Sequence, residues 1–470
     1  MGVSEGEGGG AAGHIVAVPF PAQGHVKPLL KLCRQIVRRS RGGIKVTFVN
    51  IESIHSRIIA SSSQAAEKED DNIVLTSIPD GGRPGEDQND ICSLLESLRS
   101  SMPASVADLI HRINTNSNNN NNVTCVIADI TIGWILDTGR KFGAEAVIFS
   151  PPSAASLIPI LQIPTLLEQG KLDSNGTLKA GEVITLSEDI LAWKQNDLPW
   201  SAPVDLKTQR IFFECSVRAE KAAREAKWLL TNTCYEIEPS ACDLCPNVLP
   251  IGPLLDSDRI KSSANFHPAD EVCLSWLDTK PPGSVIYVSF GSLAVFSLEQ
   301  LDELAIGLEL SGRAFLWVAR PDLANGSPVV YPEGFLERIK GVGKIVGWTD
   351  QERVLSHPST ACFLSHCGWN STMEGLIAGV PFLCWPYFAD QAHNQNYVCD
   401  KWGVGLRIEA DKNGVRSRHE IRYKIDEVFS NGGLRLRENA IKLKKMCADS
   451  VEAGGSSYNN FDKFLACLNK

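Results

Sequence analysis

Residues 348–391 read WTDQERVLSHPSTACFLSHCGWNSTMEGLIAGVPFLCWPYFADQ. This segment contains an apolar run at 362–364, a helical pattern near 371–378 and a second apolar run at 381–385. A strand that passes through a glycine-containing turn into a helix, and then into another strand, forms a βαβ unit with two parallel strands. The segment therefore predicts a parallel sheet with helices packed on its faces.

The same alternation extends from this segment in both directions along the 470-residue chain. In the second half, strands are predicted at 284–290, 314–319 and 344–346, and helices at 298–310 and 418–429. In the first half, strands are predicted at 14–20, 45–50, 73–78, 123–128, 146–149 and 228–231. A chain of this length is expected to form two domains.

Prolines cluster and the periodicity weakens across residues 246–282, which favours a linker between the domains. We therefore predict an α/β fold with two Rossmann-like, doubly wound domains that face a cleft, where ligands bind at the carboxyl ends of the strands. The predicted parts are a disordered tail (1–13), an N-terminal domain (14–250), a linker region (251–282), a C-terminal domain (283–455) and a final helix (456–470).

Composition narrows the possible classes of function. The net charge of −9 argues against a nucleic-acid binder, which would carry a basic surface. No run approaches the roughly 20 apolar residues of a membrane span, and the Gly- and Glu-rich start does not resemble a signal peptide. The 14 cysteines are scattered, and the CxxC at Cys242 and Cys245 lacks the further ligands of a zinc site. We expect a cytoplasmic protein with free thiols.

The turn between residues 363 and 372 is suited to holding phosphate oxygens. Free N–H groups at the start of the helix, together with the hydroxyl of Ser371, would form a cradle for an anion. His366 at the same turn could donate a further hydrogen bond. Glu374 lies one turn into the helix, where its carboxylate could accept hydrogen bonds from two ribose hydroxyls.

Three side chains at the ends of the segment could bind the rest of a nucleotide sugar. Trp348 offers a flat face on which a base could stack, and Asp390 and Gln391 are suited to sugar hydroxyls. Each of these features alone also has a structural explanation, as a core tryptophan, a tight turn or a helix cap.

A histidine and an aspartate in the first half form a candidate catalytic pair. His25 follows the first predicted strand, and Asp129 follows the strand at 123–128. Because both lie at carboxyl ends of parallel strands, they are expected at the same edge of the sheet. A histidine near its ordinary pKa can remove a proton, and a carboxylate on its far nitrogen fixes the tautomer. A turn histidine and a helix cap remain the structural alternatives.

Together these motifs resemble those of the plant UDP-dependent glycosyltransferases. The likeness rests on His366-Cys-Gly-Trp-Asn-Ser, Glu374, Ala378-Gly-Val-Pro and Asp390-Gln391. In the first half, Pro19-Phe-Pro-Ala-Gln-Gly-His25 is similar to the family's catalytic-histidine motif, and Ala128-Asp129 with Gly133-Trp134 to its aspartate segment. The resemblance implies a GT-B fold, whose last helix crosses back onto the first domain. It also implies inverting transfer, with His25 as the base and Asp129 as its partner.

The resemblance also assigns the donor-binding residues. Trp348 would stack on uracil beside Gln351, and Glu374 would bind the ribose. The diphosphate would be held by Ser292, His366, Asn370 and Ser371, and the sugar by Trp369, Asp390 and Gln391. A closing Gln in this motif indicates a preference for glucose. Thr349-Asp350 replace the Ala-Pro that is commoner in the family, which predicts a different backbone geometry near the base.

We therefore expect transfer of glucose from UDP-glucose to a hydroxyl of a small lipophilic acceptor such as a flavonoid, phenolic or terpenoid. The alternatives are another donor sugar, N-, S- or C-linked transfer, or an inactive UDP-sugar-binding protein. A nicotinamide oxidoreductase lacks support, because no strand is followed by G-x-G-x-x-G. UDP-sugar would be a co-substrate, with no cofactor and no metal, since the DxD at Asp256–Asp258 lies in the predicted linker and is interpreted as solvated charge.

The acceptor pocket is predicted from apolar side chains of the first half. The candidates are Trp134, Phe149, Leu157, Trp193 and Trp200. They would suit a flat or terpenoid-like acceptor, whose identity the sequence does not specify. A monomer is expected from the family resemblance alone.

Overall fold

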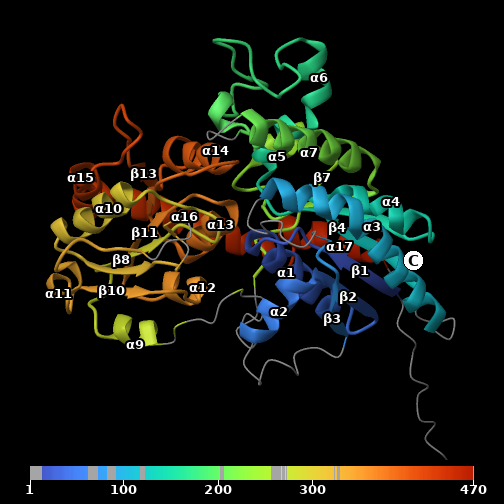
Figure 1. Ribbon diagram of the computed structural model, residues 1–470, viewed down its shortest axis with the longest axis horizontal. Coiled ribbons are helices and arrows are strands. Elements are labelled where there is room, and N and C mark those ends of the chain that lie inside the picture. The colour runs from blue at the N-terminus through green and yellow to red at the C-terminus, as the bar shows by residue number, and fades with distance from the viewer. Residues whose placement is uncertain are drawn as a thin grey trace, which may run out of the picture.

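The computed structural model describes residues 13–61, 72–81, 91–116, 122–201, 206–255, 266, 270, 272–321, 323–324 and 329–468. It contains two parallel β-sheets that lie side by side, each flanked by helices (Figure 1). The predicted α/β fold with two Rossmann-like domains is confirmed.

The first sheet has seven strands in the order β3-β2-β1-β4-β5-β6-β7, and every neighbouring pair is parallel. Its central strands are almost continuously apolar and buried, as expected where helices cover both faces. The strands are β1 (Gly13–Val18), β2 (Ile44–Ile51), β3 (Ile73–Ile78), β4 (Val123–Asp129), β5 (Glu145–Ser150), β6 (Trp228–Thr231) and β7 (Val248–Pro250). The helices are α1 (Gln23–Arg39), α2 (Glu52–Ser61), α3 (Ile91–Asn116), η2 (Ile130–Ile135), α4 (Leu136–Arg140), α5 (Ala154–Leu161), α6 (Ile163–Glu168), η3 (Gln195–Asp197), α7 (Leu206–Glu225) and α8 (Pro239–Leu244).

The second sheet has six parallel strands in the order β10-β9-β8-β11-β12-β13. The strands are β8 (Val285–Ser289), β9 (Ala314–Val318), β10 (Gly343–Val346), β11 (Thr360–Ser365), β12 (Phe382–Cys384) and β13 (Gly405–Arg407). The helices are α9 (Val272–Asp278), α10 (Leu298–Leu310), α11 (Phe335–Arg338), α12 (Gln351–Leu355), α13 (Trp369–Ala378), α14 (Gln391–Asn396), η4 (Tyr397–Lys401), α15 (Arg418–Phe429), α16 (Gly432–Val451) and α17 (Ser456–Leu468).

Each sheet has a point at which the order of its strands reverses. In the first sheet this point lies between β1 and β4, and in the second between β8 and β11. The connections that follow the two strands at this point leave in opposite directions, so that a crevice opens at the carboxyl ends of the strands. Ligands of such folds bind in this crevice. The turns that follow β1, β4, β8 and β11 therefore position the candidate site.

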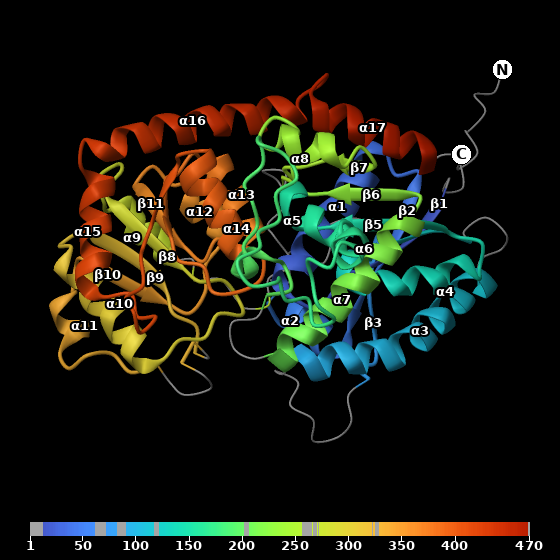
Figure 2. The same ribbon diagram turned by 90° about the horizontal axis from the view of Figure 1, so that it is seen from above.

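The last helix crosses from the second domain to the first, as predicted. Figure 2 shows α16 running along the second domain and α17 continuing over the first. Phe461 and Phe464 of α17 are buried in the first-domain core, and the ring of Phe464 lies edge-on to Trp228. Asn460 donates a hydrogen bond to the carbonyl of Pro250 at 2.9 Å. These contacts of α17 with the first domain link the two domains through the C-terminal helices.

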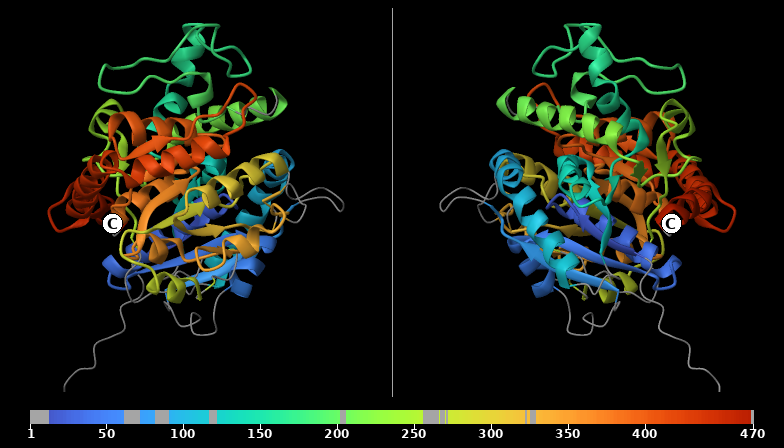
Figure 3. Two further views of the ribbon diagram at one scale, coloured as in Figure 1. Left: turned by 90° about the vertical axis from the view of Figure 1, so that its left-hand side faces the viewer. Right: turned by 90° about the vertical axis from the view of Figure 1, so that its right-hand side faces the viewer.

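Part of the predicted linker region belongs to the second domain. Residues 272–278 form α9, whose Cys273 and Leu277 are buried in the core formed by β8 and its neighbours. The short strands β7 and β13 were not predicted, because three residues are too few to give a periodic signal. Residues 162–201 around α6 project beyond the two sheets (Figure 3).

Candidate functional site

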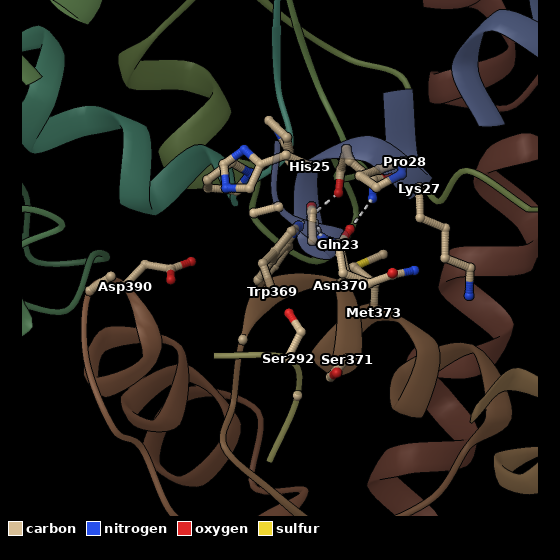
Figure 4. Close-up of a pocket in the computed structure, with 18 of the residues that line it drawn as sticks. Gln23, His25, Lys27, Pro28, Ser292, Trp369, Asn370, Ser371, Met373 and Asp390 are labelled. Atoms are coloured by element: carbon tan, nitrogen blue, oxygen red, sulfur yellow. Dashed lines mark hydrogen bonds between the residues drawn. The ribbon is translucent and has the colours of Figure 1, made fainter. Parts of the chain in front are cut away.

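A cavity lies between the carboxyl ends of the two sheets and is lined by residues of both domains. Figure 4 shows His25 of α1 on one side of the cavity and Ser292, Ser371 and Asp390, which come from the second domain, on the other. Most of the predicted catalytic and donor-binding residues line this cavity, the exception being Asp129, which lies behind His25. The fold therefore brings together motifs that are more than 300 positions apart in the sequence.

His25 and Asp129 form a hydrogen-bonded pair, with 2.7 Å between Nδ1 of the histidine and Oδ2 of the aspartate. Asp129 ends β4, is fully buried, and also accepts a hydrogen bond from the backbone N–H of Thr131 at 2.9 Å. His25 lies in the first turn of α1 rather than in the loop before it, and its side chain is 25% exposed. The pair is thus anchored on one side and accessible on the other.

The charge state of His25 is set by two opposing effects. Burial of the ring lowers its pKa, but the negative charge and hydrogen bond of Asp129 raise it by more, so the net pKa lies above the ordinary value of 6.5. The carboxylate of Asp390, across the cavity, acts in the same direction. His25 is therefore a stronger base than an exposed histidine.

His366 is packed into the turn after β11, in contact with the turn after β8. A Cβ atom on Gly291 would lie 2.7 Å from Nε2 of His366, and one on Gly368 would lie 2.5 Å from the same atom. Gly291 also has a φ of +70°, which side chains rarely adopt. Burial, with a smaller effect of Arg320, lowers the pKa of His366 to about 4. The ring is therefore neutral at pH 7 and can donate one hydrogen bond.

Glu374 and Gln351 are joined by hydrogen bonds in the second domain. Nε2 of Gln351 donates to Oε2 of Glu374 at 2.6 Å and to Oγ of Ser371 at 2.8 Å. Oε1 of Gln351 accepts a hydrogen bond from the hydroxyl of Tyr287 at 3.1 Å. The side chain of Gln351 thus holds two predicted ligand-binding residues in place.

Trp369 and Asn370, at the start of α13, contact the first domain directly. Nε1 of Trp369 donates to the carbonyl of Asn232 at 2.8 Å. The amide of Asn370 donates to the carbonyl of Gly24, one residue before His25, and accepts from the side chain of Asn232 at 3.3 Å. Both residues therefore link the two halves of the site in addition to lining the cavity.

Asp390 and Gln391 begin α14 at the opposite side of the cavity. The carbonyl oxygen of Gln391 accepts from the backbone N–H groups of Tyr387 at 2.8 Å and Phe388 at 3.2 Å, so that its NH₂ group is the part suited to a ligand. Asp390 accepts from the amide of Asn394 at 2.9 Å. Burial raises the pKa of Asp390, although Asn394 and His25 oppose this effect.

Hydrogen bonds that the sequence did not reveal hold Ser292 and the segment before α12 in place. Buried Arg320 donates hydrogen bonds to the carbonyls of Ser292 and Ala294, which fixes the loop after β8. Asp350 accepts a hydrogen bond from the backbone N–H of Arg353 and caps α12. Trp348 lines the cavity next to this cap.

Two residues other than glycine adopt a positive φ at this site. Cys367, between His366 and Gly368, has a φ of 63°, and Ala389, directly before Asp390, has a φ of 55°. Such conformations cost of the order of 1 kcal/mol or more each and cluster at functional sites. Neither residue type signals this conformation in the sequence.

Four of the five predicted acceptor-pocket residues are misplaced, and only Leu157 lines the cavity. The structure instead places Trp134 against the first-domain core, Phe149 inside β5, Trp193 in a stack with His393 at a ring-centroid distance of 4.9 Å, and Trp200 in a buried hydrogen bond to the carbonyl of Gly176. These four are removed from the prediction because Phe149, Trp193 and Trp200 are fully buried and Trp134 is a partly buried side chain packed against the core, outside the cavity lining.

The apolar lining on the first-domain side comes largely from residues that the sequence did not single out. It includes Phe20, Leu95, Ile130, Ile160 and Phe212, in addition to the predicted Leu157. Phe20 could have been found from its place in the histidine motif, and its ring lies edge-on to His25. The others lie on helices whose apolar positions look alike in the sequence whether they face the core or a cavity.

Within the described ranges, no group of three or more His, Cys, Asp or Glu side chains is arranged to hold a metal ion. Cys242 and Cys245 are buried free thiols, and burial raises the pKa of Cys245 to about 11. Asp256 and Asp258 lie outside the described residues. None of the described helices has the length and apolar character needed to cross a membrane.

Comparison with known proteins finds relatives along nearly the whole chain. The family model described as UDP-glucoronosyl and UDP-glucosyl transferase matches residues 217–450. UDP-glycosyltransferase 83A1 of Arabidopsis thaliana is 39% identical and 7-deoxyloganetin glucosyltransferase of Catharanthus roseus is 32% identical; these alignments cover 96% and 97% of this chain and 96% of each relative. The solved structure of Os79 from O. sativa in complex with UDP has a TM-score of 0.80 at 26% identity and covers 97% of this chain and 100% of its own.

Proposed function

Because the chain belongs to the UDP-glycosyltransferase family, we propose that it transfers glucose from UDP-glucose to a hydroxyl group of a small lipophilic acceptor, with inversion at the anomeric carbon. The observation that carries this proposal is the placement of the His25–Asp129 pair opposite the donor segment in one cavity. The glycosyltransferase activity itself follows from the family; the donor sugar, the acceptor and the catalytic residues are the proposal.

His25 is proposed as the general base. Its Nδ1 is held by Asp129, so Nε2 is the atom that can take the proton of the acceptor hydroxyl. As that O–H bond breaks, the oxygen attacks the anomeric carbon from the face opposite the diphosphate, and the bond from this carbon to the diphosphate oxygen breaks. The products are a β-glucoside and UDP, and Asp129 stabilises the imidazolium that forms on His25.

The proposed donor site uses hydrogen-bond donors rather than a metal to stabilise the departing UDP. His366, Ser371 and the N–H groups at the start of α13 would bind the diphosphate, with Ser292 and Asn370 beside them. Trp348 would stack on the uracil, Glu374 would bind the ribose, and Trp369, Asp390 and the NH₂ group of Gln391 would bind the glucose. A related solved structure, that of Phytolacca americana UGT2 at 27% identity, is a complex with UDP-2fluoro-glucose and pterostilbene. That complex supports a donor and an aromatic acceptor sharing such a cavity.

Gly291→Ala is expected to weaken UDP binding about tenfold or more. The new Cβ would displace His366, and a hydrogen bond to a charged group contributes about 1.5–3 kcal/mol. Gly283→Ala is the matched control, because Gly283 has a similar φ of +62° but nothing within 4 Å of its Cβ position. Both variants should lose stability through backbone strain, and only the first should lose UDP affinity in calorimetry. Equal affinities in the two variants would remove His366 from the diphosphate site.

The activity is tested by measuring UDP release from UDP-glucose, in the presence of EDTA, with a panel of phenolic and terpenoid acceptors. UDP-galactose and UDP-glucuronate are run in parallel. We expect acceptor-dependent release that is greatest with UDP-glucose, with an anomeric NMR signal that shows inversion. Release that requires added Mg²⁺ would contradict the metal-independent mechanism. UDP binding without release for any pair of substrates would favour the inactive binding protein.

A further inference from the structure

Four charged side chains meet across the cleft beside the donor site. Lys27 and Lys31 project from α1 of the first domain, and Glu352 and Glu374 from α12 and α13 of the second. Nζ of Lys27 lies 3.1 Å from Oε1 of Glu374 and 2.5 Å from Oε1 of Glu352, and Nζ of Lys31 lies 2.8 Å from the same Glu352 oxygen. We call these four residues the charge cluster. It is balanced in charge and joins the helix that carries His25 to the donor-binding domain.

The contacts of Glu374 leave room for a ligand. Its Oε1 accepts from Lys27 and its Oε2 from Gln351 at 2.6 Å. Each oxygen of an ionised carboxylate can accept two hydrogen bonds, so one position on each oxygen remains. Two vicinal hydroxyls would occupy these two positions without displacing either protein partner. The lysine contact is therefore compatible with a bound nucleotide.

We propose that Lys27 is a positioning residue for the donor, which keeps Glu374 ionised and fixes its orientation toward the two ribose hydroxyls. This inference rests on the proposed function, which assigns Glu374 to the ribose. It adds a residue of the first domain to donor recognition. Because Lys27 follows His25 by two residues on α1, the same helix start then carries both the base and the cation that orders the donor site.

Electrostatics explain why Glu374 needs this partner. Burial raises the pKa of its carboxyl group, and the ammonium of Lys27 is the largest effect that opposes the rise. Of the other groups that face it, Glu352 raises the pKa further and Lys31 lowers it, while the neutral hydroxyl of Tyr287 lies behind Gln351. The side chains of Lys27 and Glu374 are only 14% and 13% exposed, so solvent screens the pair weakly. Without Lys27, the carboxyl would take up a proton at a higher pH and lose an acceptor position.

The test compares the binding of UDP and 2′-deoxy-UDP by calorimetry at pH 6 and pH 8. The two ligands carry the same diphosphate, so its own titration cancels in the ratio of their affinities. In the wild-type protein we expect UDP to bind more tightly than 2′-deoxy-UDP, with a ratio that changes little between the two pH values. In Lys27→Met the ratio should fall at pH 6 and recover toward pH 8, with a fall at pH 6 of about tenfold for each unit by which the Glu374 pKa then lies above 6.

Two further variants separate charge from structure. Lys27→Arg retains the cation and should restore the wild-type ratio at both pH values. Lys31→Met removes the neighbouring cation, which has the smaller effect on Glu374, but keeps the contact between Lys27 and Glu374, and should lower the ratio at pH 6 less than Lys27→Met does. Thermal unfolding verifies that each variant is folded. If Lys27→Met is not, Lys27→Gln, which can still donate a hydrogen bond but carries no charge, is measured in its place.

The outcomes that contradict the inference are distinct from those that contradict the function. A ratio in Lys27→Met that equals the wild-type ratio at both pH values would overturn the role of Lys27 and leave Glu374 at the ribose. A wild-type protein that binds UDP and 2′-deoxy-UDP equally would instead overturn the ribose contact itself, and the role of Lys27 with it.

Discussion

His25→Gln is expected to lower kcat for sugar transfer by about 10²–10⁴-fold, the usual contribution of a general base, while the affinity for UDP stays unchanged. Glutamine is similar in reach and can still form a hydrogen bond with Asp129, but it cannot accept a proton at neutral pH. The donor-binding residues lie on the second domain, on the other side of the cavity from His25 (Figure 4). Calorimetry with UDP and steady-state kinetics with UDP-glucose measure the two quantities separately.

A second histidine–aspartate pair provides the matched control for this experiment. His357 lies 3.2 Å from Asp278 in the second domain and is not among the residues that line the cavity. His357→Gln should therefore leave both kcat and UDP affinity unchanged. If His25→Gln lost UDP affinity in proportion to its rate, His25 would be a binding residue and the proposed mechanism would be wrong. A variant with normal kcat would exclude His25 as the base.

The strands could be predicted because they depend on local sequence, whereas the pairing of His25 with Asp129 was predicted from their places at strand ends together with the family resemblance. Strands buried on both faces are continuous apolar runs, and residues that follow such strands must emerge at one edge of a parallel sheet. The distance of 2.7 Å between the two side chains follows from the adjacency of β1 and β4. Which strands are adjacent was not evident in the sequence, and the family resemblance favoured the catalytic role of the two residues over a turn histidine and a helix cap.

The contact between Lys27 and Glu374 could not be predicted in the same way. The two residues are 347 positions apart, and a lysine near the start of a helix is most simply explained as a solvated charge. Only the closure of one domain on the other brings the two together. The positive φ of Cys367 and Ala389 is equally hidden, because it is imposed by the surrounding turns and not by the residue type.

The acceptor pocket shows the limit of reasoning from hydrophobicity. Trp193 and Trp200 are large and apolar, which is the basis of their prediction, yet both are fully buried and the ring of Trp193 is covered by His393 of the other domain. A buried position and a position that lines an apolar cavity both favour an apolar side chain, so hydrophobicity does not distinguish them. Phe212, on α7, lines the cavity, and the next residue, Phe213, is buried beside Trp200. No pattern in the sequence distinguishes these two phenylalanines.

Asp129→Asn should reduce kcat by about 10⁴-fold, because it places the wrong tautomer of His25 at the reaction centre. The asparagine oxygen would still accept from the N–H of Thr131, so its NH₂ group would face His25. Nδ1 of the histidine would then become the acceptor, and Nε2 would carry the proton. In that state Nε2 cannot take a proton from the acceptor hydroxyl.

The pH profile distinguishes this explanation from simple disruption of the site. In the wild-type protein His25 must be neutral to act, and its pKa is raised above 6.5, so activity should fall as the pH drops through that raised value. In Asp129→Asn the charge and the charged hydrogen bond are lost, while burial continues to lower the pKa. The acid limb of kcat/KM should therefore move to lower pH even though the maximum rate is reduced. Asp278→Asn, in the pair outside the cavity, should change neither the position of the acid limb nor the maximum rate. An acid limb that stays in place in Asp129→Asn would show that a group other than His25 controls the reaction.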